Sequence, residues 1–194
     1  MSTGHSLPFA DDRVLLNLAA YWSAKRVGLP LPSRNAIDPL DMPRRLLPHL
    51  ALVEPTGQDR EIRFRLVGTE LVQRFGRDAT GKTSTDLYSG AYLDYLEDIY
   101  ATVFAKAQPL FVETQRHWPE EGHGRLRRLL LPVAADNAAP DASPQAAYVL
   151  SALSWASAEP TGHQSPPPYR RLISVDALEK GVLQATFRGL LDPP

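Results

Sequence analysis

The chain has no cysteine, and this absence removes several kinds of site at once. Disulfides, cysteine-ligated metals, a thiol nucleophile and a covalent flavin–thiol adduct are all excluded. Long apolar runs are also missing, because no stretch approaches the roughly 20 residues that a membrane span needs. The first residues show neither the basic start nor the apolar centre of a signal peptide. We therefore expect a cytoplasmic protein without membrane contact.

The chain also lacks a surplus of either charge. Its 194 residues include 21 Lys and Arg against 22 Asp and Glu, which gives a net charge of −1. Surfaces that bind nucleic acid usually need a basic excess, so we expect no nucleic-acid partner. Hydrophobic residues make up 43% and charged residues 22%, which is typical of a globular protein. The length suits one domain with a sizeable core and some additional segments.

An amphipathic helix is predicted near the amino terminus. Two aspartates precede a bulky apolar stripe of Leu15, Leu18 and Trp22, with Tyr21 beside it, and Gly28 can end the helix. Such a stripe must be buried against something. We predict that Leu15, Leu18, Tyr21 and Trp22 form a surface for a homodimer or another partner.

Alternation and turn residues predict five strands. The clearest period of two lies in residues 61–66, where Ile62, Phe64 and Leu66 are expected on one face. A turn over residues 55–59 should join the first two strands as an antiparallel hairpin. The predicted strands cover residues 49–54, 61–66, 110–118, 125–133 and 146–155.

Helical patterns precede the hairpin and fill the interval between the second and third strands. The predicted segments are Asp38 to Leu47, Glu70 to Phe75, a single turn from Ser84 to Tyr88, and a long helix from Gly90 to Gln108. This order predicts an α+β fold. Beyond a Pro-rich stretch, residues 172–175 and 182–187 are expected to be extended, with a turn from Asp176 to Lys180 between them.

Short motifs in the first four fifths of the chain carry a family resemblance. They are Tyr21-Trp22, Arg26, Pro32, Arg34, Ile37-Asp38-Pro39, Leu47-Pro48-His49-Leu50, Phe64-Arg65-Leu66-Val67-Gly68-Thr69 and Gly76-Arg77-Asp78-Ala79-Thr80-Gly81. From Asp11 to Trp155 the chain resembles a single-domain PAS family of proteobacterial sensory and regulatory proteins. The resemblance implies a five-stranded antiparallel sheet with helices on one face. It also implies a signalling module that binds small molecules or proteins, often as a dimer, and is not a catalyst.

The resemblance also implies how the chain is divided. We expect a disordered leader over residues 1–10, a PAS-like domain with its amino-terminal helix over 11–156, a Pro-rich linker over 157–168 and a carboxyl-terminal extension over 169–194. A ligand cavity is expected between the inner face of the sheet and the long helix. Its predicted lining is Phe64, Leu66, Phe75, Tyr100, Trp118, Leu129 and Trp155. Neither the motifs nor the composition identify a ligand or cofactor.

A second interpretation starts from the letters of residues 76–83. Gly76, Gly81, Lys82 and Thr83 fit the phosphate-binding pattern G-x-x-x-x-G-K-[ST]. That chemistry requires a strand before the loop and a long helix after it, so that backbone N–H groups meet the phosphates. Here a helical pattern precedes the loop, and Gly90 follows within seven residues. We therefore favour turns for these glycines and keep phosphate binding as an alternative.

The remaining polar candidates give weaker signals. His117 and His123 lie beside two glutamates, a set that an exposed turn explains better than a metal site. Arg125, Arg127 and Arg128 are interpreted as a solvated strand edge rather than an anion-binding patch. No metal site and no catalytic residues are predicted.

Three functions remain open. The leading hypothesis is a cytoplasmic sensory or regulatory module that binds a small ligand, a partner protein or both, has no catalytic output and signals through an unidentified partner. The second is a ligand-free interaction or dimerisation domain, which a copurified small molecule would contradict. The third is a nucleotide-binding protein, for which Lys82→Ala should abolish nucleotide binding.

Overall fold

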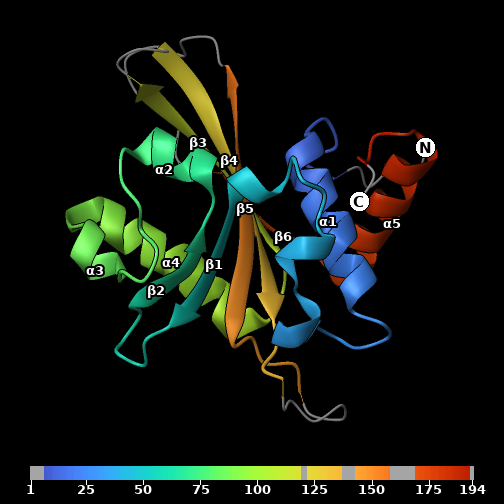
Figure 1. The fold of residues 1–194 in the computed structure, drawn as a ribbon, viewed down its shortest axis with the longest axis horizontal. Helices are drawn as coiled ribbons and strands as arrows, with labels where there is room; N and C mark the ends of the chain where they lie inside the picture. The colour runs from blue at the N-terminus through green and yellow to red at the C-terminus, as the bar shows by residue number, and fades with distance from the viewer. Residues whose placement is uncertain (1–6, 119–121, 137–142, 158–168, 193–194) are drawn as a thin grey trace.

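A six-stranded antiparallel sheet separates two groups of helices (Figure 1). The computed structural model describes residues 7–118, 122–136, 143–157 and 169–192. The strands are β1 (Leu50–Pro55), β2 (Ile62–Val67), β3 (Leu110–Trp118), β4 (Gly122–Val133), β5 (Tyr148–Ser157) and β6 (Tyr169–Leu172), in the spatial order β2-β1-β5-β4-β3-β6. The α+β class is confirmed. The sheet has one more strand than predicted, because β6 pairs with the edge of β3.

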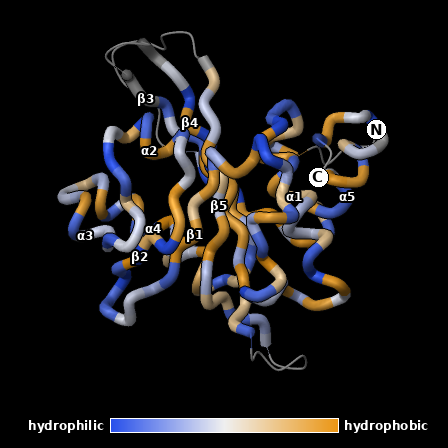
Figure 2. The backbone as a smooth tube through the Cα atoms, viewed as in Figure 1, coloured by the Kyte–Doolittle hydropathy of each residue, from blue (hydrophilic) through white to orange (hydrophobic). Residues whose placement is uncertain are grey.

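One face of the sheet, here called the inner face, lies beneath α2 (Thr69–Phe75), α3 (Ser84–Leu87) and α4 (Gly90–Lys106). The long helix α4 supplies Leu96, Ile99 and Val103, which pack among buried strand residues such as Val53 and Leu130. Figure 2 shows the apolar residues concentrated along the central strands and the helices that cover them. The sequence pattern predicted these three helices close to their observed limits.

The opposite face, here called the outer face, lies beneath α1 (Arg13–Lys25) and α5 (Val175–Phe187). The Asp12 side chain caps α1 by accepting a hydrogen bond from the Leu15 amide at 3.2 Å. Trp22 is fully buried, and its Nε1 donates to the Pro132 carbonyl at 2.7 Å. Helices therefore cover both faces, because α1, the expected additional amino-terminal helix, and α5 lie opposite α2, α3 and α4.

The predicted partner surface on α1 needs correction. Leu15, Leu18 and Trp22 have no exposed surface, and Tyr21 is 7% exposed. These side chains pack against the sheet within the same chain, and α5 lies beside α1. The sequence correctly showed that the stripe must be buried but did not show that the chain buries it itself. A homodimer remains a prediction without an assigned surface.

The carboxyl-terminal segment also differs from expectation. Residues 182–187, predicted to be extended, form the second half of α5, which begins at Val175 with the Ser174 side chain as its cap. Leu178 and Ala185 are buried at helical spacing against α1 and the sheet. The outer face provides the apolar surface that makes this segment helical.

The expected leader is ordered from Leu7 onward. Leu7 and Phe9 are buried, and the ring centroid of Phe9 lies 5.6 Å from that of Phe111. Leu7 packs so closely against α5 that a Cβ on Gly181 would lie 2.3 Å from the Leu7 Cγ. Residues 1–6 and most of the predicted Pro-rich linker lie outside the described residues.

The short helix predicted from Asp38 to Leu47 is replaced by separate 3-10 turns. Asp38 does cap the first of them, η2 (Pro39–Asp41), by accepting from the Leu40 amide at 2.9 Å. After an interruption, η3 (Leu47–His49) follows at the end of the segment. A further 3-10 turn, η1 (Arg34–Ala36), lies before the segment. Prolines within the segment remove amide donors, so a continuous α-helix cannot form.

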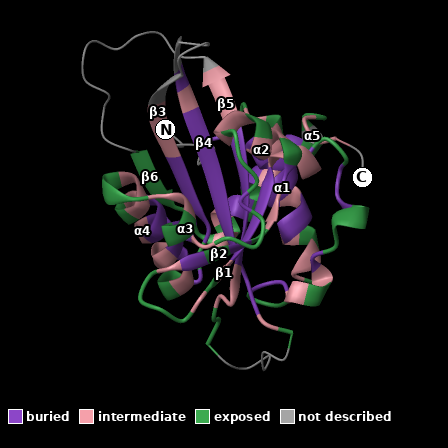
Figure 3. Ribbon diagram, turned by 60° about the vertical axis from the view of Figure 1, so that its left-hand side comes forward, coloured by how far each residue is buried: buried purple, intermediate pink, exposed green. Residues whose placement is uncertain are grey.

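Figure 3 shows where burial is concentrated. Residues of β4 and β5 are largely buried, because both neighbouring strands and helices cover them, whereas all four residues of the edge strand β6 are exposed. Within the described residues, no helix combines the length and the apolar character that crossing a membrane would require. The candidate site lies on the inner face of these central strands, β4 and β5.

Candidate functional site

A cavity of about 40 Å³ lies between the inner face of the sheet and the helices above it. Strands β1, β2, β4 and β5 form its floor, and α2, α4 and the segment between α2 and α4 form its walls. The cavity thus lies where the sequence predicted a ligand site. Its lining is mostly aromatic and aliphatic, with two arginines and no acidic residue.

Helical spacing explains which side chains reach the cavity. Tyr92, Leu96 and Tyr100 follow one another at intervals of four residues on α4, so they lie on one stripe. Leu71 and Phe75 do the same on α2. Two helices of different length therefore present matched apolar stripes toward the same space.

A bulge in the β1–β2 ladder changes the expected alternation of β2. Leu52 pairs with Leu66, but the next residue, Val53, pairs with Phe64, so Arg65 is the additional residue. Such a bulge reverses the side on which the following residues fall. Phe64 lines the cavity, whereas Leu66 packs on the outer-face core and Val67 lines the cavity instead.

The predicted lining is therefore only partly brought together. Phe64, Phe75 and Tyr100 line the cavity as predicted. Besides Leu66, Leu129 is also misassigned, because its place on β4 directs it to the outer-face core beneath α1. Trp155 lies away from the cavity: its ring is 6.0 Å from that of His49, and the Arg74 guanidinium lies 5.2 Å from its centre. The side chain of Trp118 lies outside what the structure describes.

Arg128 is the main residue that the sequence interpretation misplaced. It is 3% exposed on the inner face of β4 and lines the cavity, rather than lying on a solvated strand edge. Its Nη2 donates to the Tyr92 hydroxyl at 3.0 Å, and its Cζ lies 5.8 Å from the centre of the Tyr95 ring. Burial opposes its charge, but the neighbouring tyrosine oxygens hold the pKa of Arg128 above its ordinary value. The side chain is charged at neutral pH.

The cavity wall between residues 77 and 92 contains a second cation, Arg77, and a pair of tyrosines, Tyr88 and Tyr92. The rings of Tyr88 and Tyr92 meet edge to face with centroids 4.9 Å apart. The guanidinium of Arg77, an exposed residue, lies 4.6 Å from the centre of the Tyr88 ring. Burial raises the pKa of Tyr88, so its hydroxyl is protonated at neutral pH. This wall combines aromatic surface with positive charge.

A hydroxyl chain links α4 to the floor of the cavity. The hydroxyl groups of Tyr100 and Ser151 lie 3.3 Å apart, and Ser151 donates to the Ala51 carbonyl at 3.3 Å. Burial raises the pKa of Tyr100. Because Ser151 donates to Ala51, the Tyr100 hydroxyl donates to Ser151, and the chain leaves a neutral oxygen acceptor beside an otherwise apolar floor, in addition to the charged donor Arg128.

The phosphate-like segment has the geometry of turns. Gly76 ends α2 with a left-handed φ of 69°, and Thr83 begins α3 with a capping box in which Asp86 takes part. The Gly81 amide donates to the Phe64 carbonyl at 2.7 Å, and the Lys82 amide donates within the turn. These N–H groups are already bonded and α3 has four residues, so the segment provides no phosphate cradle.

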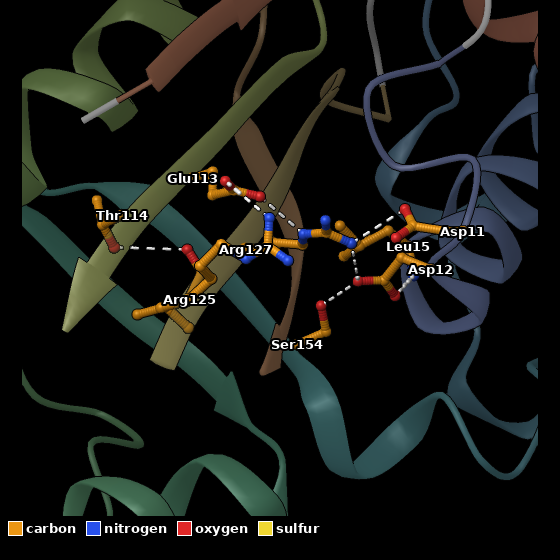
Figure 4. A network of polar contacts seen from close by, with 9 residues as sticks. Asp11, Asp12, Leu15, Glu113, Thr114, Arg125, Arg127 and Ser154 are labelled. Atoms are coloured by element: carbon orange, nitrogen blue, oxygen red, sulfur yellow. Dashed lines mark hydrogen bonds and ion pairs between the residues drawn. The ribbon is translucent and has the colours of Figure 1, made fainter. Parts of the chain in front are cut away.

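Arg127, the neighbour of Arg128, lies on the opposite face in a paired network (Figure 4). Its Nε donates to Glu113 at 2.8 Å and its Nη1 to Asp11 at 3.1 Å, with Asp12 3.8 Å away. The Ser154 hydroxyl also donates to Asp12. Burial works against its charge, but these carboxylates raise the pKa of Arg127 overall. The network borders an open hollow of about 430 Å³, which Trp155 also lines.

The sequence did carry a signal for these two arginines. Adjacent residues of a strand point to opposite faces, so Arg127 and Arg128 cannot share one solvated face. The strand around them is strongly apolar, and both of its faces are covered. The side chains of His117 and His123, the histidine pair considered for a metal, lie outside the described residues. Within that set, no group of three or more metal-ligating side chains occurs.

Comparison with known proteins identifies the family. A family model described as a PAS domain matches residues 11–143, more than half of the chain. The chain belongs to the PAS-domain family. The PAS match begins just before α1 and extends past β4, so it includes Arg127, Arg128 and all of the cavity lining except Leu153 on β5. Family membership makes this chain a sensory or regulatory module.

Two solved structures are similar to this PAS protein. The crystal structure of the Rhodobacter sphaeroides LOV protein is 14% identical, with a TM-score of 0.38, over 75% of this chain and 69% of that one. A single-residue variant of the same protein, RsLOV, is also 14% identical, with a TM-score of 0.39, over 94% of this chain and 86% of that one. The comparison with curated proteins gives no match.

Proposed function

We propose that this PAS protein is a sensory module that binds a small molecule in the inner-face cavity. The observation that supports the proposal is the cavity itself, which lies between the sheet and α4 and joins an aromatic lining to a few convergent polar groups. Binding sites for small molecules combine these two features. The proposed output is regulatory: the occupied domain acts on a partner protein and catalyses no reaction of its own.

A change at the cavity can reach the helices on both faces of the sheet. The cavity touches α2 and α4 directly, and its floor strands β4 and β5 carry α1 on their other face. A ligand that fills the hollow would stiffen α2 and α4 against the sheet. A partner that contacts these helices would then recognise the occupied state, provided that occupancy changes their conformation or mobility.

Native mass spectrometry of the full chain tests ligand binding. A bound small molecule should accompany the wild-type protein and be lost in Ala51→Val, which places two extra carbons in the cavity floor. The control Ala91→Val changes an exposed position of α4 and should retain the molecule. If neither protein carries a ligand and a screen of small molecules detects no binding, the module functions without a cavity ligand and the proposal is wrong.

A further inference from the structure

The cavity contains a buried positive charge that the described chain leaves partly unsatisfied. Arg128 is only 3% exposed, and its Nη1 has no hydrogen-bond partner among the described residues. Nη2 is bonded only to a neutral hydroxyl, that of Tyr92. The neutral tyrosine hydroxyls offer this guanidinium oxygen acceptors but no opposite charge, and a buried donor without an acceptor carries a free-energy cost of its own. The missing interaction is therefore an acceptor that carries negative charge.

The acidic residues of α4 do not provide it. Glu97 is buried but accepts a hydrogen bond from the Ser84 hydroxyl at 2.6 Å. Asp98 pairs with Arg170 and, at 3.8 Å, with Arg60. Within the described part of the chain, no carboxylate forms an ion pair with Arg128, although the neighbouring Arg127 has three. The contrast between the two arginines shows that this fold can pair a buried guanidinium and does not do so in the cavity.

We infer that the cavity binds a small aliphatic carboxylate, whose oxygens accept hydrogen bonds from Arg128. This inference rests on the proposed function, because it names the ligand class for the same cavity. A guanidinium presents its N–H groups in a planar fork that matches a carboxylate, and charge-assisted hydrogen bonds of this kind are among the strongest in proteins. The binding group is thus Nη1 of Arg128, which has a free N–H to donate.

The size of the cavity limits the ligand. Its volume of about 40 Å³ is roughly three times the 10–15 Å³ that holds one water, and well below the roughly 150 Å³ of a cavity that binds benzene. Acetate and propionate are the carboxylates closest to this size, whereas an aromatic acid requires a much larger movement of α2 or α4. The apolar side chains of Leu71 and Leu96 surround the remaining space and suit a short alkyl tail.

Arg77 adds a second favourable charge on the cavity wall. It is exposed, lies against the Tyr88 ring and lines the same cavity. An exposed cation raises the local concentration of anions and speeds their entry, and salt screens this effect. Its replacement should therefore weaken carboxylate binding less than replacement of Arg128.

The test is a titration of the full chain with sodium propionate, followed by NMR chemical shifts and by thermal melting at constant ionic strength. Propionamide, of nearly the same shape but uncharged, is the matched ligand control. Arg128→Met should weaken propionate binding about ten- to hundredfold, the effect expected for a hydrogen bond to a charged group. Arg125→Met, the same change on the outer side of β4, should leave binding unchanged.

Melting of the ligand-free proteins separates a binding role from a structural one. Replacing a buried charge by an apolar side chain of similar size often stabilises a protein. Ligand-free Arg128→Met should therefore melt higher than the wild type, by about 2–4 °C for a chain of this length, while no longer responding to propionate. A lower melting point together with unchanged propionate binding would show a structural arginine and overturn the inference.

The outcomes also distinguish this inference from the proposed function. If propionate does not bind but a neutral molecule does, and Ala51→Val removes that binding, the cavity is a ligand site and the carboxylate inference is wrong. If phosphate or chloride binds as tightly as propionate, the site recognises charge alone and the carboxylate inference is also wrong. If nothing binds to the cavity, both the inference and the proposed function fail.

Discussion

Arg127 and Arg128 are neighbours on β4, yet they meet opposite environments on the two faces of the sheet. On the outer face, Arg127 is surrounded by Asp11, Asp12 and Glu113. On the inner face, Arg128 meets tyrosines and a cavity but no carboxylate. Both side chains are almost fully buried, at 7% and 3% exposure. Burial alone therefore does not distinguish a structural charge from a binding charge; the partners do.

The same contrast extends to the packing of the two faces. The outer face is closed by α1 and α5, with large side chains such as Trp22, Phe9 and Leu15 fully buried. The inner face carries the cavity and several tyrosines that are only partly buried. A sheet packed firmly on one side can tolerate a hollow on the other, because the stability of the outer face offsets what the inner face loses in packing.

The largest expected effect tests the closed outer face. Trp22→Ala removes a fully buried ring and its hydrogen bond to the Pro132 carbonyl, so it should cost about 4 kcal/mol of unfolding free energy. Trp155→Ala removes the same side chain from a half-buried site and should cost about 2 kcal/mol. Urea unfolding followed by circular dichroism measures both. Equal costs would remove the distinction in packing between the two sites.

The next prediction concerns the paired arginine. Arg127→Met leaves Asp12 without its cation and Glu113 with only the more distant Arg125, and breaking a buried ion pair should cost about 3 kcal/mol. This sign is opposite to that expected for ligand-free Arg128→Met. Arg125→Met is the control and should cost less than about 1 kcal/mol, because the Arg125 side chain is 38% exposed and its Nη1 lies 3.8 Å from Glu113. If Arg127→Met and Arg128→Met shift the urea midpoint in the same direction, the contrast between the faces is wrong.

Much of the fold was predictable because its signals are local. The period of two in residues 61–66 and the long helical stripe after Gly90 predicted a strand and a helix close to those observed. The motif around Gly68 has a physical basis as well, since a Cβ there would lie 2.2 Å from the Pro48 carbonyl oxygen. Close backbone packing at the end of β2 therefore requires glycine.

The misassigned parts depend on contacts between distant segments. Residues 182–187 become helical only because the outer face offers them an apolar surface, and the stripe on α1 is buried by the same sheet. Leu66 changes face through one additional residue in β2, which no local pattern reveals. Arg128 was missed although adjacent strand residues point to opposite faces, because only the covering helices show that both faces of β4 are buried. The cavity's location followed from the family resemblance, not from the residues that line it.

A smaller effect separates the charge of Asp12 from its role as a helix cap. Asp12→Asn keeps an oxygen that can cap α1, because asparagine is an equally good capping residue, but removes one carboxylate from Arg127. Glu113 and Asp11 still pair with Arg127, so the cost should be about 1 kcal/mol. Asp12→Ala removes the cap as well and should cost about 1 kcal/mol more. Equal urea midpoints for the two variants would assign the whole effect to the charge.

The smallest effect at neutral pH belongs to Tyr100. Tyr100→Phe removes a 3.3 Å contact with Ser151, which keeps its own bond to the Ala51 carbonyl, so the loss should be only about 0.5 kcal/mol. The larger signature is its pH dependence. Burial raises the pKa of Tyr100, so the folded protein holds the phenol proton more tightly than the unfolded chain does. The unfolded chain then releases that proton first, and stability falls as pH rises above the ordinary tyrosine pKa of about 10.

The phenylalanine variant isolates this alkaline contribution. Tyr21 and Tyr88 also have raised pKa values and remain in both proteins, so their effects cancel in the difference. The wild type should be slightly more stable at pH 7, and its advantage should shrink and then reverse as pH rises beyond about 10. Urea unfolding of both proteins from pH 7 to 11 measures the difference. Parallel curves over that range would show that the Tyr100 hydroxyl is hydrated in solution, and that the inner-face floor is open to water rather than closed beneath α4.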